Sequence, residues 1–150
     1  TPNYLPMITA KRLLQMKGPD TWTVSPHKTV YEALQLMAEK NIGAVPVVDE
    51  DMLVGMFSER DYARKVVLQG KSSFETRVGE LMTPRVYFVK PSRSMDDCMR
   101  LMTHMHIRHL PVVDFGQLKG IITIGDVVKA IIAQQEQTIQ ELERYVAGGY

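Results

Sequence analysis

The stretch Ile42-Gly-Ala-Val-Pro-Val-Val-Asp49 occurs a second time, with changes, as Ile107-Arg-His-Leu-Pro-Val-Val-Asp114. The copies lie 65 positions apart, and the same offset aligns residues 24–61 with residues 89–126 without a gap. Twelve aligned positions are identical, where ordinary residue frequencies give roughly two or three by chance. The chain therefore contains one supersecondary unit repeated in tandem, and each copy is expected to bury its apolar face against the other.

Each copy shows the pattern strand, helix, strand, strand, helix. The first helix of each copy follows a hydroxyl residue with an acid three positions later, Thr29 with Glu32 and Ser94 with Asp97, which is a typical N-terminal cap. Asn41 ends the earlier of these helices. A third helical pattern runs from Asp126 to about Ala147, where Gly148-Gly149 closes it.

Two β-hairpins are predicted from pairs of short apolar runs that flank a turn. The runs cover residues 45–48 and 53–57 in the first copy, and 110–113 and 118–122 in the second. We therefore expect an α/β (α+β) fold, with two β-α-β-β-α repeats related by a pseudo-twofold axis and packed through their sheets. The expected organisation is a single module over 1–150, with repeat one at about 7–68, repeat two at about 77–133 and a C-terminal helical extension over 134–150.

Composition excludes several classes of protein. A net charge of +1 without a long basic stripe argues against nucleic acid as the partner. No apolar run reaches the length of a membrane span, and no signal-peptide pattern opens the chain, so we expect a cytoplasmic protein with no membrane contact. The single cysteine, Cys98, excludes an internal disulfide.

The chemistry-bearing motif follows the second hairpin strand of each copy. It reads Gly55-Met-Phe-Ser-Glu-Arg-Asp61 in the first copy and Gly120-Ile-Ile-Thr-Ile-Gly-Asp126 in the second. In the structural interpretation, the hydroxyl caps a helix and the aspartate favours its positive end. In the ligand interpretation, the aspartate accepts both hydroxyls of a ribose and the nearby backbone N–H groups favour phosphate. Both interpretations remain open at this point.

The ordered motifs resemble the CBS domain pair, or Bateman module, over about residues 7–133. Within that family, residues 58–73, Ile107 to Val113 and the ending 145–150 are more narrowly similar to stand-alone bacterial CBS-pair proteins and plant CBSX proteins. The resemblance implies a disc-shaped homodimer that binds an adenosine nucleotide (AMP, ATP or NAD) between its repeats. It also implies that the protein regulates an unidentified partner protein and is not an enzyme.

The resemblance implies two composite clefts, each with adenine on one repeat and ribose on the other. In the first cleft, the implied residues are Trp22, Val24, Ile42, Gly43, Ala44 and Pro46 for adenine, with Thr123, Gly125 and Asp126 for ribose. In the second cleft, they are Tyr87, Val89, Ile107, Arg108, His109 and Pro111, with Ser58, Arg60 and Asp61. Ordinary packing or rim positions are the alternative for the aromatic residues.

The two copies differ where phosphate would bind. Arg60, Arg108 and His109 offer cationic groups to the cleft at Asp61, whereas Gly125 replaces Arg60 in the other copy. We therefore expect unequal affinities, with the cleft at Asp61 as the tighter mononucleotide site.

Other chemistries find less support in the sequence. His104, His106 and His109 do not share a helix face, and no carboxylate or cysteine completes a ligand set, so no metal is expected. No Ser-His-Asp set, Walker loop or pair of catalytic carboxylates is present in the sequence. The rival functions are a structural dimerisation module without ligand and, with less support, an enzyme that acts on the nucleotide.

Overall fold

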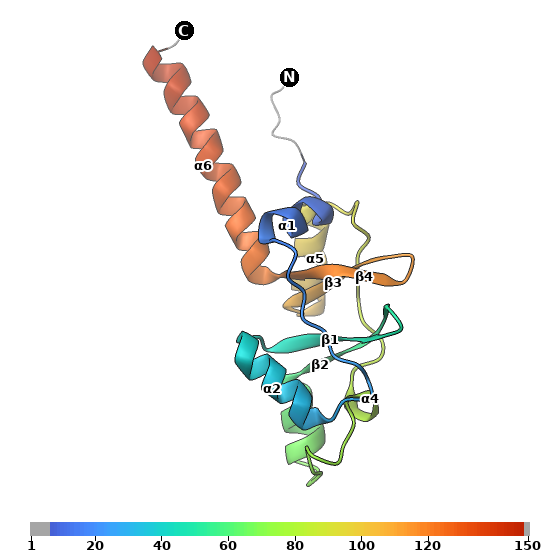
Figure 1. Ribbon diagram of the computed structural model, residues 1–150. Coiled ribbons are helices and arrows are strands. Elements are labelled where there is room, and N and C mark those ends of the chain that lie inside the picture. Colours follow the sequence, from blue (N-terminus) through green and yellow to red (C-terminus); the bar gives the residue numbers. More distant parts are fainter. Residues whose placement is uncertain (1–6, 149–150) are drawn as a thin grey trace.

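Two β-hairpins, one from each repeat, form the centre of the structure, a computed structural model that describes residues 7–148 (Figure 1). Helices flank both hairpins, and the last helix extends away from the body of the molecule. The elements are α1 (Ala10–Lys17), α2 (Val30–Lys40), β1 (Ala44–Asp49), β2 (Met52–Ser58), α3 (Glu59–Tyr62), the π-helical turn η1 (Ala63–Val67), α4 (Val78–Leu81), α5 (Met95–Met105), β3 (His109–Asp114), β4 (Gln117–Thr123) and α6 (Ile124–Gly148). The predicted α/β fold class is confirmed.

Each hairpin closes through a two-residue turn with a left-handed backbone. Glu50 and Asp51 have φ angles of 49° and 67° between β1 and β2, and Phe115 and Gly116 have 52° and 79° between β3 and β4. Two consecutive residues with positive φ match the right-handed twist of the strands that they connect. Both predicted hairpins are confirmed, and each strand extends slightly beyond its apolar run.

The repeats meet where the two hairpins touch edge to edge. Met52 of β2 pairs with Gln117 of β4 in antiparallel register, which gives the strand order β1-β2-β4-β3. Beside this pair, the backbone N–H of Leu53 donates to the carbonyl of Gly116 at 3.2 Å. The repeats therefore contact each other through their sheets, as the sequence predicted.

The first strand of each predicted repeat is reduced to a single parallel bridge. Val24 pairs with Val47, and Val89 pairs with Val112. The chain continues into Pro26 and Pro91, which carry no backbone N–H, so neither bridge grows into a longer ladder.

The predicted helix boundaries in the two repeats are confirmed. Thr29 and Glu32 form a reciprocal capping box at the start of α2, and Ser94 accepts from the backbone N–H of Asp97 at the start of α5. Asn41 ends α2 in the left-handed conformation, and His106, the matching residue, ends α5 in the same way.

Each repeat surrounds its own apolar core, and each core receives a helix from outside that repeat. Ala10 and Leu13 of α1 are buried with the β3, β4 and α5 side chains of the second repeat. Val78 and Leu81 of α4 are buried in the core of the first repeat. The sequence assigned α1 to the first repeat, but its apolar face completes the second (Figure 1).

The glycine of the repeated motif makes room for these helices. A Cβ atom at Gly55 would lie 2.7 Å from the Sδ of Met82 and 2.8 Å from the carbonyl oxygen of Thr83. A Cβ atom at Gly120 would lie 2.6 Å from a methyl carbon of Leu14. The motif therefore requires glycine for close packing.

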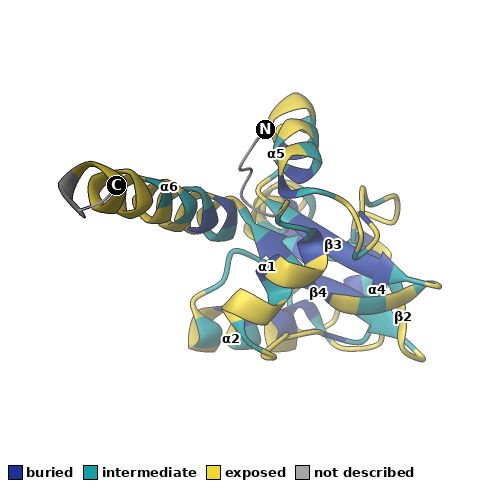
Figure 2. Ribbon diagram, turned by 90° about the horizontal axis from the view of Figure 1, so that it is seen from above, coloured by how far each residue is buried: buried dark blue, intermediate teal, exposed yellow. Residues whose placement is uncertain are grey.

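The last helix begins two residues earlier than predicted and reaches Gly148; Gly149 lies outside the described residues. Its outer half is exposed, whereas Val127 and Ala130 near its start are buried (Figure 2). Within residues 7–148, no helix combines the length and apolar character needed to cross a membrane.

We expect Gly55→Ala to lower the free energy of unfolding by about 1–3 kcal/mol, a typical cost of overpacking. The new methyl group would press against the Thr83 backbone, which is hydrogen-bonded to Met56 and has little freedom to move. Gly120→Ala should cost less, because the flexible side chain of Leu14 can turn away. Urea denaturation of both variants measures the difference, and equal losses would contradict this explanation.

Candidate functional site

Two matching carboxylates lie at the starts of α3 and α6. Ser58 caps α3 by accepting from the backbone N–H of Asp61 at 3.1 Å, and Thr123 accepts from that of Asp126 at 3.1 Å. Each aspartate in turn accepts from the backbone N–H of its capping residue, at 3.0 Å for Ser58 and 2.9 Å for Thr123. The structural cap predicted from the motif is therefore present in both repeats.

Both carboxylate oxygens of Asp61 have partners. Oδ2 accepts from the Ser58 backbone and from the Ser58 hydroxyl, the latter at 3.1 Å. Oδ1 accepts from the hydroxyl of Thr83 at 3.3 Å and lies 3.2 Å from the ammonium of Lys65. Lys65 also donates to the carbonyl of Leu81 at 3.1 Å. Asp61 is only 8% exposed, so these contacts compensate for a buried charge.

The surroundings of Asp126 are more open. Its Oδ2 accepts from Thr123 and lies 2.9 Å from the ammonium of Lys17, whereas the structure records no donor to Oδ1 from residues 7–148. Burial alone would raise the pKa of Asp126, but the Thr123 and Lys17 hydrogen bonds and the Lys17 charge outweigh it, so the pKa lies below its ordinary value. The carboxylate is therefore ionised near neutral pH.

The structure brings each hydroxyl–aspartate pair close to the start of the first hairpin strand of its own repeat, β1 or β3. Ala44 is the register partner of Ser58, and the N–H of Glu59 donates to the carbonyl of Gly43 at 3.0 Å. In the second repeat, His109 is the register partner of Thr123, and the N–H of Ile124 donates to the carbonyl of Arg108 at 3.1 Å. The contribution of both repeats to each cleft stays a prediction.

The apolar residues assigned to the clefts divide into core and rim. The side chains of Val24, Pro46, Val89 and Pro111 are buried inside their repeats. Ile42 and Ile107 are half-buried against the same cores.

The two matching aromatic residues lie on the surface. Trp22 is 39% exposed and Tyr87 is 51% exposed. The ammonium of Lys40 lies 4.1 Å from the centre of the Trp22 ring, which is a cation–π contact. Trp22 and Tyr87 therefore have the exposure needed to contact a ligand or a second subunit.

The residues assigned to phosphate differ in exposure. Arg60, Arg108 and Gly125 are exposed, and the structure records no ion pair for either arginine within residues 7–148. His109 is half-buried. Burial, together with the nearby charges of Lys17 and Arg108, lowers the pKa of His109 although Asp126 opposes the shift. His109 is therefore largely neutral at pH 7.

Three functional candidates, Lys17, Lys65 and Thr83, were not identified from the sequence. The lysines belong to no motif, and their contacts depend on how α1 and η1 fold. Thr83 could have been found from the sequence, because the 65-residue offset also aligns Thr83-Pro84 with Gly18-Pro19 upstream of the repeated motif. That alignment shows a hydroxyl in one copy that is absent from the other.

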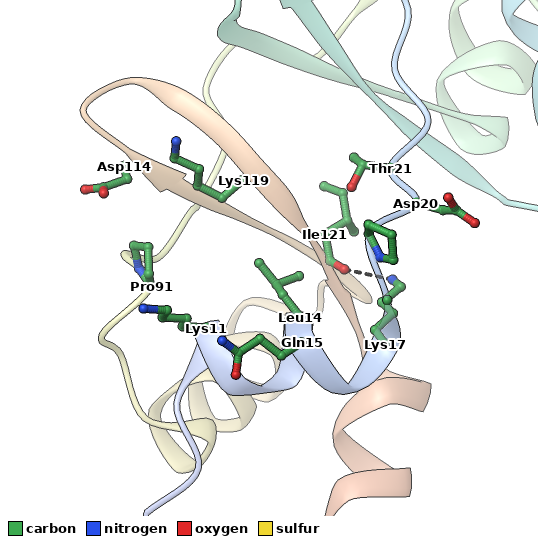
Figure 3. Close-up of a pocket in the computed structure, with 12 residues that line it drawn as sticks. Lys11, Leu14, Gln15, Lys17, Asp20, Thr21, Pro91, Asp114, Lys119 and Ile121 are labelled. Atoms are coloured by element: carbon green, nitrogen blue, oxygen red, sulfur yellow. Dashed lines mark hydrogen bonds between the residues drawn. The ribbon is translucent and has the colours of Figure 1, made fainter.

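A cavity of about 570 Å³ lies between α1, β4 and the segment that follows α1 (Figure 3). Lys17 points toward β4 there and donates to the carbonyl of Ile121 at 2.7 Å. Asp20 and Thr21 line the side of the cavity that faces the first repeat. Lys17 therefore both lines the cavity and pairs with Asp126, which does not line it.

No metal centre is evident in the described part of the chain, where no three His, Cys, Asp or Glu side chains are grouped to hold an ion. Cys98 is buried, and burial, with a smaller effect of Asp97 opposed by Arg93, raises its pKa to about 11. This thiol is therefore protonated and unreactive at neutral pH.

Comparison with known proteins identifies relatives along most of the chain. The family model described as "CBS domain" matches residues 16–68 and 78–133. CBS domain-containing protein CBSX3, mitochondrial, of Arabidopsis thaliana is 40% identical over 127 residues, which cover 81% of this chain and 62% of that protein. This chain thus spans less than two thirds of the length of CBSX3.

Solved structures support the same relationship. A CBS-domain protein from Burkholderia ambifaria is 53% identical with a TM-score of 0.75, covering 84% of this chain and 93% of that chain. CBSX2, from Arabidopsis thaliana and in complex with AMP, is 32% identical with a TM-score of 0.74, covering 85% and 98%.

Two hairpin repeats in contact through their sheets, each with a hydroxyl–aspartate pair at the start of a helix, define a tandem-repeat module. The family match and the identity to its relatives then establish the particular family. The chain belongs to the CBS domain family, and the resemblance seen in the sequence is confirmed.

The free energy of unfolding is expected to decrease as the pH falls from about 7 to 5, because the unfolded chain binds a proton on His109 more readily than the folded chain does. The ordinary pKa of 6.5 applies to the unfolded state, and the folded value is lower. His109→Gln should therefore show a weaker pH dependence over this interval. Urea titrations at several pH values measure the slopes, and identical slopes would exclude His109 as the cause.

Proposed function

We propose that the protein is a regulatory module that binds an adenosine nucleotide (AMP, ATP or NAD) between its two repeats and modulates a partner protein. The single observation that carries this proposal is the Lys17–Asp126 pair, with its nitrogen and oxygen 2.9 Å apart. It places a cation beside an ionised carboxylate that retains one oxygen without a recorded donor among the described residues.

This pair has the chemistry of ribose-phosphate recognition. A carboxylate oxygen accepts a hydrogen bond from a sugar hydroxyl, and an ammonium group neutralises a phosphate oxygen. The pair lies at the start of α6, a helix of 25 residues whose N-terminal end favours anions. The AMP complex of CBSX2, whose solved chain is covered to 98% at 32% identity, supports the same ligand class.

Regulation requires the ligand to bind two conformations of the protein with different affinities. Asp126 belongs to the first turn of α6, whose outer half is exposed and carries the apolar side chains of Ile139, Leu142 and Val146. A ligand that reorganises the first turn therefore changes the position of a surface available to a partner protein.

The rival interpretation treats both motifs as structural caps. The contacts of Asp61 favour this interpretation for the first repeat, since all of them lie within the chain. The two interpretations differ in one measurable respect, because a structural module binds no nucleotide at saturable sites.

The double variant Asp61→Ala/Asp126→Ala is expected to bind AMP, ATP and NAD at least tenfold more weakly than the wild type. Removing a charged hydrogen-bond acceptor costs about 1.5–3 kcal/mol, which corresponds to at least a tenfold weaker affinity. Calorimetric titration measures the binding, with circular dichroism as the control for folding. A folded double variant that binds as tightly as the wild type would show that the aspartates do not hold the sugar.

We also expect a homodimer in which α6 contributes to the contact between subunits. Along its length α6 exposes several large apolar side chains, more than a solvated helix needs: Ile132, Ile139, Leu142 and Val146. Sedimentation should give twice the chain mass at micromolar concentration, and Ile139→Glu/Leu142→Glu should weaken the association. A wild-type monomer under these conditions would contradict the prediction.

A further inference from the structure

The end of α1 and the segment that follows α4 contact equivalent positions of β4 and β2, but through different groups. Thr83 pairs with the side of β2 opposite β1, donating its N–H to the carbonyl of Met56 at 2.8 Å and accepting from the Met56 N–H at 3.0 Å. The residue that matches Met56 is Ile121, and there the ammonium of Lys17 donates to the carbonyl. Gly18 matches Thr83 by the repeat offset. One strand edge is thus closed by backbone and the other by a single side chain.

This difference changes the state of the first aspartate. The Thr83 pairing holds its hydroxyl 3.3 Å from Oδ1 of Asp61. An aliphatic hydroxyl that donates to a carboxylate makes the same contact as a ribose hydroxyl would. With Lys65 on the same oxygen and Ser58 on the other, Asp61 has no oxygen left without a partner. Side chains of the protein itself therefore occupy the acceptor that a nucleotide needs.

The second aspartate has no such internal substitute. Gly18 carries no hydroxyl, and the structure records no donor to Oδ1 of Asp126 within residues 7–148. The Lys17 ammonium uses two of its three N–H groups, on Asp126 and on Ile121, so one donor remains. A vacant acceptor and a cationic donor thus lie side by side, which suits a group with both a hydroxyl and an anionic oxygen.

The cavity next to β4, beside Lys17, is also larger than the corresponding cavity next to β2. The cavity beside Lys17 and Gly18 measures about 570 Å³. A smaller cavity of about 200 Å³ lies along β2, where Val54, Pro84 and Val86 match Lys119, Pro19 and Thr21 of the larger one. The cavity on the side at which Thr83 pairs with the strand is thus smaller than the cavity on the side at which Gly18 leaves the edge open.

We infer that Thr83 acts as a built-in substitute for a ligand hydroxyl at Asp61, so that each chain binds one nucleotide, at Asp126. The inference rests on the proposed function and specifies its stoichiometry and its site. Lys17 is the residue that selects a phosphorylated ligand there. The resulting order of affinities is opposite to the order expected from Arg60 and Arg108.

Calorimetric titration with AMP tests the inference through the number of sites. The wild type should bind one AMP per chain, and Asp126→Ala should bind none. Thr83→Ala removes the hydroxyl and frees an acceptor on Asp61, so this variant should bind two AMP per chain. Thr83→Ser keeps the hydroxyl and, as the matched control, should bind one.

The double variant Thr83→Ala/Asp126→Ala should recover one weaker site, at Asp61. Two AMP per wild-type chain, or one remaining site in Asp126→Ala, would overturn the inference and leave the proposed function intact. A Thr83→Ala variant that is folded and still binds one AMP would show that the Thr83 hydroxyl does not prevent binding at Asp61. Absence of binding in every folded variant would overturn both the inference and the proposed function.

The role of Lys17 has its own measurement. Lys17→Met should lower the affinity for AMP by at least tenfold. It should lower the affinity for adenosine much less, because adenosine carries no phosphate to contact the ammonium. Lys11→Met, which removes a lysine from the same cavity wall without touching Asp126, is the matched control and should keep the AMP affinity. An equal loss for AMP and adenosine in Lys17→Met would refute the selecting role.

Discussion

The packing of α1 and α4 against the opposite repeats is the interaction on which the rest of the structure depends. Ala10 and Leu13 complete the second core, and Val78 and Leu81 complete the first. Equivalent backbone contacts dock both helices, with the N–H of residue 10 bonded to the carbonyl of residue 93 and that of residue 78 to the carbonyl of residue 28, each at 2.8 Å. Neither repeat therefore closes its core with its own segment alone, and the two repeats are mutually dependent.

The packing of α1 and α4 on the opposite repeats also determines what surrounds each aspartate. Since α1 precedes the first repeat but packs on the second, its last residue, Lys17, reaches Asp126. The segment after α4 reaches Asp61 in the corresponding way, through Thr83. A partly buried carboxylate needs a hydrogen-bonded or charged partner, and here each exchanged segment supplies one. The chemical difference between the clefts thus arises in the connecting segments, outside the aligned motif itself.

Features that depend on neighbouring residues were predictable from the sequence. The repeat, both hairpins, the caps of α2 and α5 and the hydroxyl–aspartate pairs follow from periodicity and turn chemistry, which act over a few positions. The first strands, the π-helical turn and the packing of α1 depend on contacts between distant segments, which local patterns do not encode. The same reason explains why Lys17 and Lys65 were missed, since their partners are defined only once helix and sheet meet.

Coupling between a bound ligand and the surface follows from where Asp126 lies. The residue contacts α1 through Lys17, and it belongs to the first turn of α6, next to the core residue Val127. A ligand that engages Asp126 and Lys17 acts on both helices at once, and the two helices pack against each other. Thermodynamic reciprocity requires that any partner which favours one arrangement of α1 and α6 changes the affinity of the cleft by the same factor. Under the proposed function, a nucleotide at Asp126 and Lys17 would act on the exposed face of α6 through two adjacent helices, with no long pathway between them.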